Sequence, residues 1–411
     1  MCLKNKNYLT IVFFVVKFKK VIKMKNIPKY ILFTLLGALV GSIVTFLLMD
    51  NLGTTNKCRV TIKNNQFEPV IEAYETLKND YYKNIDDNIL INGMINGMME
   101  ATDDKHTMFF DEKETEDFLT EINGSYYGIG AQIYQTDDEY VTISKVFKDS
   151  PAQKAGLQIG DKFVSIDGES MKGKTPSEVS SILRSSEAKK ATLVIKRGDE
   201  EKTIEVEKET VIIDSVSSEK LDNNIGYIEI NSFSALTDNQ FTDALNSLEK
   251  EGIKSLIIDL RGNGGGYLST VTNIISRFVD SKTVIYQIKT KKETTSYKAL
   301  NNSTLNYKVV ILVDESSASA SEIMCSALQE QYGAILVGKT TYGKGTVQEM
   351  KQLSNKTMFK YTTEEWLTSK GNSIEGVGVK PDYEVDLSDE FYSNPIREND
   401  NQLQKAIELL K

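Results

Sequence analysis

The longest apolar run in the chain covers residues 30–49 and reads YILFTLLGALVGSIVTFLLM. Its twenty residues carry no charge, which is enough for a helix to cross a bilayer. Six lysines lie within residues 17–29, and Asp50 follows the run. Because positive residues favour the cytoplasmic side, we expect residues 1–29 inside and the remaining chain outside. No A-x-A-like cleavage site follows, which favours an uncleaved transmembrane anchor over a signal peptide.

After a linker at residues 50–65, apolar residues recur at spacings near three and four, which predicts helices. We therefore define residues 66–123 as an N-terminal helical segment. A methionine cluster on this pattern, Met94, Met98 and Met99, is expected to fill a core. Between residues 124 and 208 the pattern changes to short strands separated by turns, with one helix predicted at residues 175–183.

Strand and helix patterns alternate from residue 209 to residue 411. The predicted elements are strands at 225–230, 256–260, 309–313 and 334–337, and helices at 238–250 and 319–331. Such alternation indicates an α/β core with functional sites at the carboxyl ends of its strands. The terminal pattern at 401–410 is an amphipathic helix, suited either to pair with a second copy in a homodimer or to dock on its own core.

The composition excludes several classes of function. A net charge of −9 and a pI near 5.1 argue against nucleic acid as a partner, because phosphate binding needs clustered Lys and Arg. Three cysteines and one histidine provide neither a disulfide framework nor a paired metal motif. We therefore do not expect a zinc enzyme.

Two glycine-rich stretches follow predicted strands, but both fail as nucleotide-binding motifs. In RGNGGGY, at residues 261–267, Tyr267 stands where the third glycine of a dinucleotide fingerprint belongs. In GKTTYGKG, at residues 338–345, Gly345 replaces the hydroxyl that would bind Mg²⁺, and the following residues look extended rather than helical.

A run of small hydroxyl residues, SSASASEIMCSAL at 316–328, follows the predicted strand 309–313 and opens a helix. A serine in this position is suited to be a nucleophile. The competing interpretation is structural, because Ser319 and Glu322 form an S-x-x-E capping box. Chemistry alone does not choose among the serines of the run. The glycine-rich turn at 262–266 offers backbone N–H groups for an oxyanion.

A serine nucleophile needs a base, and the chain offers two candidates. His106 lies in the polar turn 103–107 (DDKHT), where a solvated or locally hydrogen-bonded side chain is expected. Lys344 lies between glycines in Tyr-Gly-Lys-Gly. Burial can lower a lysine pKa by about 3–5 from its free value near 10.4, which gives a neutral amine able to deprotonate serine. Gln348 is placed to orient that amine, whereas a surface lysine in a turn is the alternative.

Four ordered stretches of the core resemble the C-terminal processing peptidases (tail-specific proteases) of family S41. They are DLRGNGGG at 259–266, SSASASEI at 316–323, GKTTYGKGTVQ at 338–348 and GVGVKPD at 376–382. The resemblance implies a crotonase/ClpP-like serine protease core without metal or cofactor. It also implies roles for individual residues: Ser319 as nucleophile, Lys344 as base, Gln348 as its orienter, and the Ala320 N–H with a glycine of 264–266, preferably Gly265, as oxyanion hole. The turn 103–107 departs from the family pattern, which usually holds a proline there.

Within residues 124–208, SPAQKAGLQIGD at 150–161 resembles PDZ domains. Bare N–H groups at a glycine-flanked turn can hold a terminal carboxylate, while the adjoining strand edge accepts an extended peptide. The resemblance assigns the carboxylate-binding loop to Gly128, Ile129, Gly130 and Ala131. Arg184, at the end of the predicted helix, is expected to contact the protease core when a tail is bound, unless it is merely a solvated helix-end arginine.

The sequence thus predicts an α/β multidomain protein in which a PDZ domain is inserted between an N-terminal helical segment and a protease core at 209–411. We expect a membrane-anchored, outward-facing serine endopeptidase that acts on protein substrates with accessible C-terminal tails. The alternative is a catalytically silent PDZ scaffold that only gathers such tails.

Overall fold

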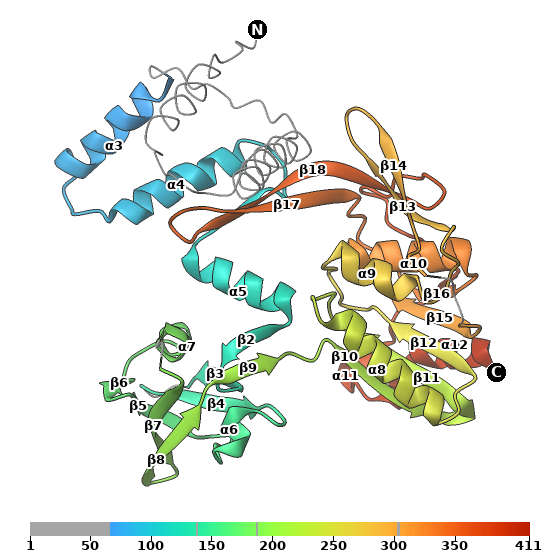
Figure 1. Cartoon of the computed structure of the whole chain (residues 1–411), viewed down its shortest axis with the longest axis horizontal. Helices are drawn as coiled ribbons and strands as arrows, with labels where there is room; N and C mark the ends of the chain where they lie inside the picture. The colour runs from blue at the N-terminus through green and yellow to red at the C-terminus, as the bar shows by residue number, and fades with distance from the viewer. Residues whose placement is uncertain (1–65, 137–138, 186–187, 302–304) are drawn as a thin grey trace, which may run out of the picture. The chain divides into compact units, whose positions relative to one another are not determined.

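The computed structural model of the chain describes residues 66–136, 139–185, 188–301 and 305–411 (Figure 1). The chain divides into two compact units, residues 1–85 and 86–411. In the first unit, α3 (Glu68–Asp80) begins with a proline in its first turn and buries none of its residues. The elements below all belong to the second unit.

The predicted membrane anchor at residues 30–49 lies outside the described residues, as do residues 1–29 and the linker 50–65. Within the described ranges, no helix combines the length and the apolar character that a bilayer crossing needs.

In the second unit, two helices and a short strand precede the predicted PDZ domain: α4 (Asp87–Glu100), β1 (Met108–Phe110) and α5 (Glu112–Asn123). Asp111 and Glu114 form a capping box that starts α5, and Gly124 ends it in the left-handed conformation. Strand β1 interrupts a segment that was predicted to be helical. The expected methionine core is also wrong, because α4 has no buried residue and Met98 is 52% exposed.

The inserted domain is built on an antiparallel sheet with the strand order β3-β4-β5-β7-β8. Its elements are β3 (Ala131–Gln135), β4 (Val141–Val146), α6 (Pro151–Lys154), β5 (Lys162–Ile166), β6 (Glu169–Ser170), α7 (Pro176–Ser185), β7 (Lys190–Arg197) and β8 (Glu200–Glu207). Strands β2 (Ser125–Gly128) and β9 (Glu209–Ile212) pair where the chain enters and leaves this domain. Phe163, Leu193 and Ile195 are fully buried in its separate core.

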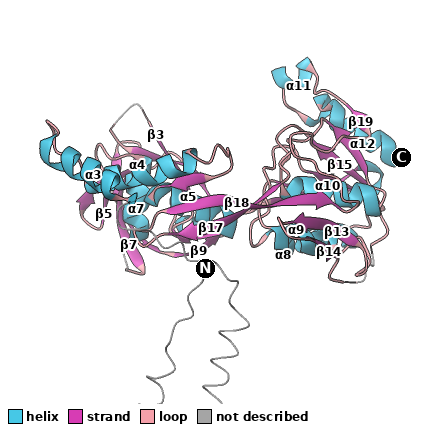
Figure 2. Cartoon of the chain, turned by 90° about the horizontal axis from the view of Figure 1, so that it is seen from above, coloured by secondary structure: helices cyan, strands magenta, loops and turns pink. Residues whose placement is uncertain are grey.

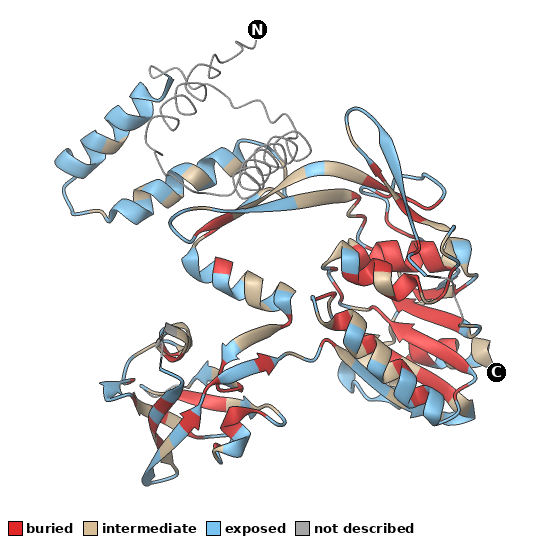
Figure 3. Cartoon of the chain, in the orientation of Figure 1, coloured by how far each residue is buried: buried red, intermediate tan, exposed pale blue. Residues whose placement is uncertain are grey.

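Residues 209–411 contain a second sheet with the order β10-β11-β12-β15-β16-β19 (Figure 1). Its strands are β10 (Val216–Leu221), β11 (Ile225–Ile230), β12 (Ser255–Asp259), β15 (Lys308–Val313), β16 (Ile335–Gly338) and β19 (Tyr383–Glu384). All pairs from β11 to β19 are parallel, so β12, β15 and β16 end at one edge of the sheet. Continuous apolar runs form these strands because both faces of the sheet are buried (Figure 3).

Alternate residues of the strands face different helices. One face packs against α8 (Thr237–Lys250), α9 (Leu268–Ile275) and α10 (Ala320–Gln331), with Ile258 and Ile311 at the centre. The other face, which includes Ile257 and Val310, packs against α12 (Asn401–Leu410) through Leu403 and Ala406. The structure thus shows the terminal helix docked on its own core, the second of the two predicted alternatives. Short helical turns at α11 (Asp389–Ser393) and residues 397–399 precede it.

An antiparallel sheet not predicted from the sequence joins β1 to elements of residues 209–411. Its order is β1-β18-β13-β14, and β17 also pairs with β18. The strands are β13 (Val284–Lys289), β14 (Thr294–Lys298), β17 (Thr346–Gln352) and β18 (Met358–Thr368), and the last two form a long pair in Figure 2. Because β17 begins two residues after Lys344, this sheet fixes one end of the loop that carries the predicted base.

Candidate active site

Ser319 lies at the turn between the carboxyl end of β15 and the start of α10. Its φ of 57° and ψ of −113° are unusual for a residue with a side chain. Such a conformation costs about 1–3 kcal/mol and is typical of nucleophiles displayed at a sharp strand-to-helix turn. The side chain lines a cavity of about 560 Å³. Lys344, Gln348 and the glycine turn 264–266 line the same cavity.

The neighbouring serines have other roles. The buried Ser317 hydroxyl donates to the Leu260 carbonyl at 2.8 Å, and that of buried Ser321 donates to the Asn263 carbonyl at 2.9 Å. Ser316 is exposed and does not line the cavity. Of the serines at the start of the run, Ser319 is therefore the one placed to react with a ligand in the cavity, a choice that sequence chemistry left open.

Lys344 is half-buried in the loop between β16 and β17. Burial, together with the neighbouring Lys360 ammonium, lowers the pKa of Lys344 from 10.5 to about 8. The carboxylates of Glu322, Asp104 and Glu375 act in the opposite direction. A substantial fraction of the amine is therefore neutral near pH 8, so the alternative of a surface lysine in a turn is wrong.

Glu322 connects the serine turn to the lysine loop. Its fully buried carboxylate accepts hydrogen bonds from the Ser319 N–H at 2.8 Å and the Lys344 N–H at 2.9 Å. It also accepts from the Thr341 hydroxyl at 2.6 Å and the Gly343 N–H at 2.7 Å. Sequence reasoning identified Glu322 only as part of a helix cap, whereas the structure shows that it positions both Ser319 and Lys344.

Gln348 lies on β17 and lines the cavity, but its amide nitrogen is used elsewhere. It donates to the Thr346 hydroxyl at 2.9 Å and to the Thr362 hydroxyl at 3.3 Å. These bonds fix the orientation of the amide within the sheet. Its predicted role as orienter of the amine stays a prediction.

The glycine turn after β12 packs directly against the serine turn. A Cβ added at Gly265, which has φ 108°, would lie 2.9 Å from the Ser319 Cβ and 3.1 Å from the Ala320 nitrogen. A side chain is excluded there, and the backbones approach closely. However, the Gly265 N–H donates to the Asn263 Oδ1 at 2.8 Å, so in this conformation it is not available to an oxyanion. Ala320 is the first residue of α10, where the N–H groups have no acceptor within the helix.

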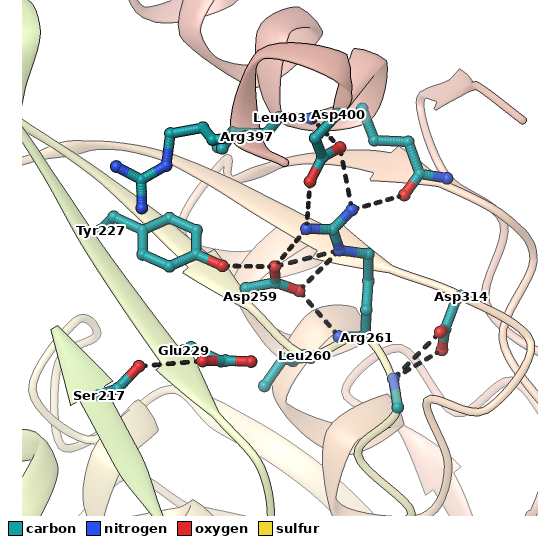
Figure 4. Close-up of polar contacts among 12 residues, drawn as sticks. Ser217, Tyr227, Glu229, Asp259, Leu260, Arg261, Asp314, Arg397, Asp400 and Leu403 are labelled. Atoms are coloured by element: carbon teal, nitrogen blue, oxygen red, sulfur yellow. Dashed lines mark hydrogen bonds and ion pairs between the residues drawn. The ribbon is translucent and has the colours of Figure 1, made fainter. Parts of the chain in front are cut away.

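A charged network holds the strand that leads into the glycine turn (Figure 4). The Arg261 guanidinium bonds Asp259 of β12 at 2.6 Å and Asp400 beside α12 at 2.8 Å. The Tyr227 hydroxyl donates to Asp259 at 2.7 Å. The carboxylate of Asp314 then accepts the Gly262 N–H at 3.0 Å, which ties the glycine turn to the end of β15.

The turn that contains His106 lies against the same site. The Lys105 ammonium is 3.2 Å from the Tyr342 hydroxyl, and the Thr362 N–H donates to the Thr107 hydroxyl at 3.3 Å. His106 is half-buried, and within the described residues its Nε2 is buried without a hydrogen-bond partner. Burial lowers the pKa of His106, and the charges of Lys344 and Lys105 act in the same direction. The prediction was a solvated or locally hydrogen-bonded histidine. The side chain is half-buried rather than solvated, and the local hydrogen bond runs from the His106 backbone N–H to Asp104 at 2.9 Å.

The predicted carboxylate-binding loop, Gly128 to Ala131, connects β2 to β3. Ile129 is buried in the core of the inserted domain. The Gly130 backbone N–H donates a hydrogen bond to the Tyr126 phenol oxygen. The Arg184 guanidinium lies 5.5 Å from the Tyr126 ring centroid. In this structure Arg184 pairs with Glu116 of α5 at 2.8 Å, rather than with the protease core.

Three family models match the chain: peptidase family S41 over residues 224–385, the PDZ domain over 142–197, and the activating protease CtpB N-terminal domain over 45–115. The carboxy-terminal processing protease CtpA of Bacillus subtilis (strain 168) is 35% identical over 368 residues, which cover 89% of this chain and 79% of that protein. A probable CtpA-like serine protease of Staphylococcus haemolyticus is 36% identical, over 76% of this chain and 63% of that protein. The corresponding protein of Staphylococcus epidermidis is 33% identical, over 85% and 71%. The chain therefore belongs to peptidase family S41, among its carboxy-terminal processing serine proteases that carry a PDZ domain.

Proposed function

We propose that the chain is a serine endopeptidase that holds substrate C-terminal tails on its PDZ domain and cleaves through a Ser319–Lys344 acyl-enzyme mechanism. The observation that carries this proposal is the cavity shared by a serine in a strained turn and a half-buried lysine with a lowered pKa. Glu322 supports it further, because one carboxylate fixes the backbone of both residues.

In this mechanism the neutral Lys344 amine removes the Ser319 proton while Oγ attacks the scissile carbonyl carbon. The Ala320 N–H and the glycine turn 264–266 stabilise the negative oxygen of the tetrahedral intermediate. Donation by Gly265 requires that its N–H first leave the Asn263 side chain. When the C–N bond breaks, Lys344 returns the proton to the leaving amine. Water, deprotonated by the same amine, then hydrolyses the ester.

The PDZ domain supplies the proposed tail-binding site. Helix α7 contacts β3, the arrangement in which an extended peptide adds to a strand edge. The loop Gly128–Ala131 lies at the start of β3, where a terminal carboxylate would bind. Arg184, beside this loop, is proposed to exchange Glu116 for the protease core when a tail is bound.

Casein digestion tests the activity directly. The full chain in detergent is expected to degrade casein, and Ser319→Ala is expected to lower the rate by at least about 10⁴-fold, because the nucleophile is lost. Ser316→Ala is the matched control, since this serine is exposed and lies outside the cavity. Absence of cleavage by the unmodified chain, with tail peptides still bound, would favour the silent scaffold.

The proposal also includes anchoring by residues 30–49, with the catalytic part outside the cytoplasm; the support is the sequence alone. Protease added to intact cells is expected to remove the part after residue 50, while the lysine-rich N-terminus stays protected. A cytoplasmic protein measured in the same samples serves as the control. The orientation is wrong if the catalytic part is digested only after the cells are lysed.

A further inference from the structure

Lys360 is a second lysine in the active-site cavity, and the proposed mechanism does not use it. It lies on β18, where its backbone pairs with Met350 of β17 on one side and with Met108 of β1 on the other. Lys360 and Thr362 are two residues apart on β18, so their side chains lie on the same face of the sheet, about 7 Å apart along the strand. Thr362 accepts the hydrogen bond from Gln348, which also lines the cavity. The Met350–Lys360 pair therefore lies two residues along the β17–β18 ladder from the Gln348–Thr362 pair, on the same face of the sheet.

Aromatic rings rather than carboxylates surround the Lys360 ammonium. Its Nζ lies 5.4 Å from the Phe110 ring centroid and 5.7 Å from that of Phe118. Within the described residues, no carboxylate comes within 4.0 Å of it. Glu121, which also lines the cavity, is the carboxylate whose charge acts on Lys360 from a greater distance. A cation held on rings at the wall of a cavity keeps its N–H donors for a ligand.

We propose that Lys360 forms a subsite for a carboxylate of the substrate peptide, close to the scissile bond. The proposal rests on the proposed function, because it needs a peptide in the cavity beside Ser319. A lysine ammonium binds a carboxylate as a point charge without strict geometry, which suits an Asp or Glu side chain or a terminal carboxylate. The aromatic wall from Phe110 and Phe118 favours this contact, because it limits competition from water.

Lys360 also acts on the proposed base. The charged groups whose fields act on Lys344 are the Lys360 ammonium and the carboxylates of Glu322, Asp104 and Glu375. His106 is a further titratable group within reach of the Lys344 charge, and its pKa is lowered. Loss of the Lys360 cation removes a repulsion from the protonated form of Lys344. The acidic limb of kcat/KM is therefore expected to move to higher pH in Lys360→Met, a shift that a purely structural role for Lys360 does not predict.

The test is a set of fluorogenic peptides in which a single Glu is moved through each position on both sides of the scissile bond. Each is compared with the Gln peptide at the same position, and one pair compares a free with an amidated C-terminus. With the full chain, we expect one position, or the free terminus, to raise kcat/KM by about tenfold, the effect of one charge-assisted contact. The position that responds identifies which carboxylate the subsite takes.

The variants assign the preference to Lys360. Lys360→Met is expected to bring the Glu/Gln ratio close to one, Lys360→Arg to retain a preference, and Lys360→Glu to reverse it in favour of a Lys peptide. Lys351→Met is the matched control, since it removes the same charge from an exposed position on β17. Peptide binding to Ser319→Ala, measured by fluorescence anisotropy with and without Lys360→Met, gives the same comparison without turnover.

The outcomes separate this proposal from the proposed function. Cleavage of all peptides with a Glu/Gln ratio near one at every position overturns the subsite and leaves the peptidase intact. If no peptide is cleaved but the Glu peptide binds Ser319→Ala about tenfold more tightly than the Gln peptide, the subsite stands and the proposed chemistry fails. A preference that survives Lys360→Glu unchanged also overturns the assignment.

Discussion

Lys344→Ala is expected to lower kcat/KM for peptide hydrolysis by at least about 10⁴-fold, because it removes the amine that takes the Ser319 proton in the proposed mechanism. Lys344→Arg is expected to fail to the same degree, since a guanidinium stays protonated and cannot act as a base. The measurement is the initial rate of cleavage of a fluorogenic peptide.

The pH dependence gives an independent test of the same base. Only the neutral amine accepts the proton, and the pKa of Lys344 is lowered to about 8. kcat/KM is therefore expected to rise about tenfold per pH unit below pH 8 and to level off above it. If the base were a lysine with the ordinary pKa of 10.5, kcat/KM would instead keep rising until about pH 10.5.

The lowered pKa has a consequence for stability with a defined sign. The folded protein binds the Lys344 proton less tightly than the unfolded chain, so this group destabilises the fold at pH values below about 8. The destabilisation disappears as the pH rises from about 8 to 10.5. Lys344→Met, which fills the same space without charge, is expected to raise the free energy of unfolding at pH 7 by about 2 kcal/mol. Lys344→Met is therefore expected to be inactive and at the same time more stable than the parent protein.

The control for these measurements is Lys339→Ala, five positions earlier in the chain. The Lys339 ammonium pairs at the surface with Asp386 at 2.6 Å, a contact with little expected effect on activity. Activity that persists in Lys344→Ala but disappears in His106→Ala would move the role of base to the histidine, whose Nε2 is buried beside the same loop.

Local sequence patterns were sufficient for four strands of the parallel core, β11, β12, β15 and β16, but not for the short strand β19. Strand β11 covers residues 225–230 as predicted, and α8 begins one residue before its predicted start and ends at Lys250. Buried parallel strands are continuous apolar runs, and each is separated from the next by an amphipathic helix, so both signals are local. The antiparallel sheet gave no such signal. Strand β14 is exposed along its whole length, and β13 pairs with β18 from a distant part of the sequence, which no local pattern encodes.

The residues of the candidate site also fall into those that the sequence predicted and those that only the structure identifies. Family motifs predicted Ser319 and Lys344, which line one cavity, but they did not indicate the groups that act on these two residues from other elements. The family resemblance implied Gly265 as an oxyanion donor, and only the structure shows that its N–H is bonded to Asn263. Lys360 carried no motif at all, because its place in the cavity depends on how β18 pairs with its neighbours.

Glu322 shows most clearly what a local interpretation omits. The S-x-x-E pattern correctly indicates a bond to the Ser319 N–H, three residues away. The bonds to Gly343 and Lys344 cross 21 and 22 residues and arise because β15 and β16 are adjacent in the sheet. The same carboxylate thus serves as a helix cap and as the link between the proposed nucleophile and the proposed base.

Glu322→Gln is therefore expected to affect both stability and activity. An amide keeps one acceptor oxygen but turns N–H groups toward two of the four donors that Glu322 now satisfies. Leaving those donors unpaired in a buried site is expected to lower the free energy of unfolding by about 2–4 kcal/mol. Displacement of the Ser319 turn relative to Lys344 is expected to lower kcat by about 100-fold, because small misplacements of reacting groups are costly.

The pH profile of the residual activity separates this positioning role from a loss of the base itself. The Glu322 carboxylate raises the pKa of Lys344, so its removal should lower that pKa and move the acidic limb of kcat/KM below pH 8. We therefore expect a larger neutral fraction of the Lys344 amine at pH 7 together with a lower maximal rate. This combination indicates a base that is deprotonated but misplaced relative to Ser319. Glu330→Gln, at the far end of α10 where the carboxylate bonds the Lys370 N–H, is the control and should change neither the limb nor the maximal rate. If Glu322→Gln retains the full rate at pH 9, its carboxylate caps the helix and does not position the catalytic pair.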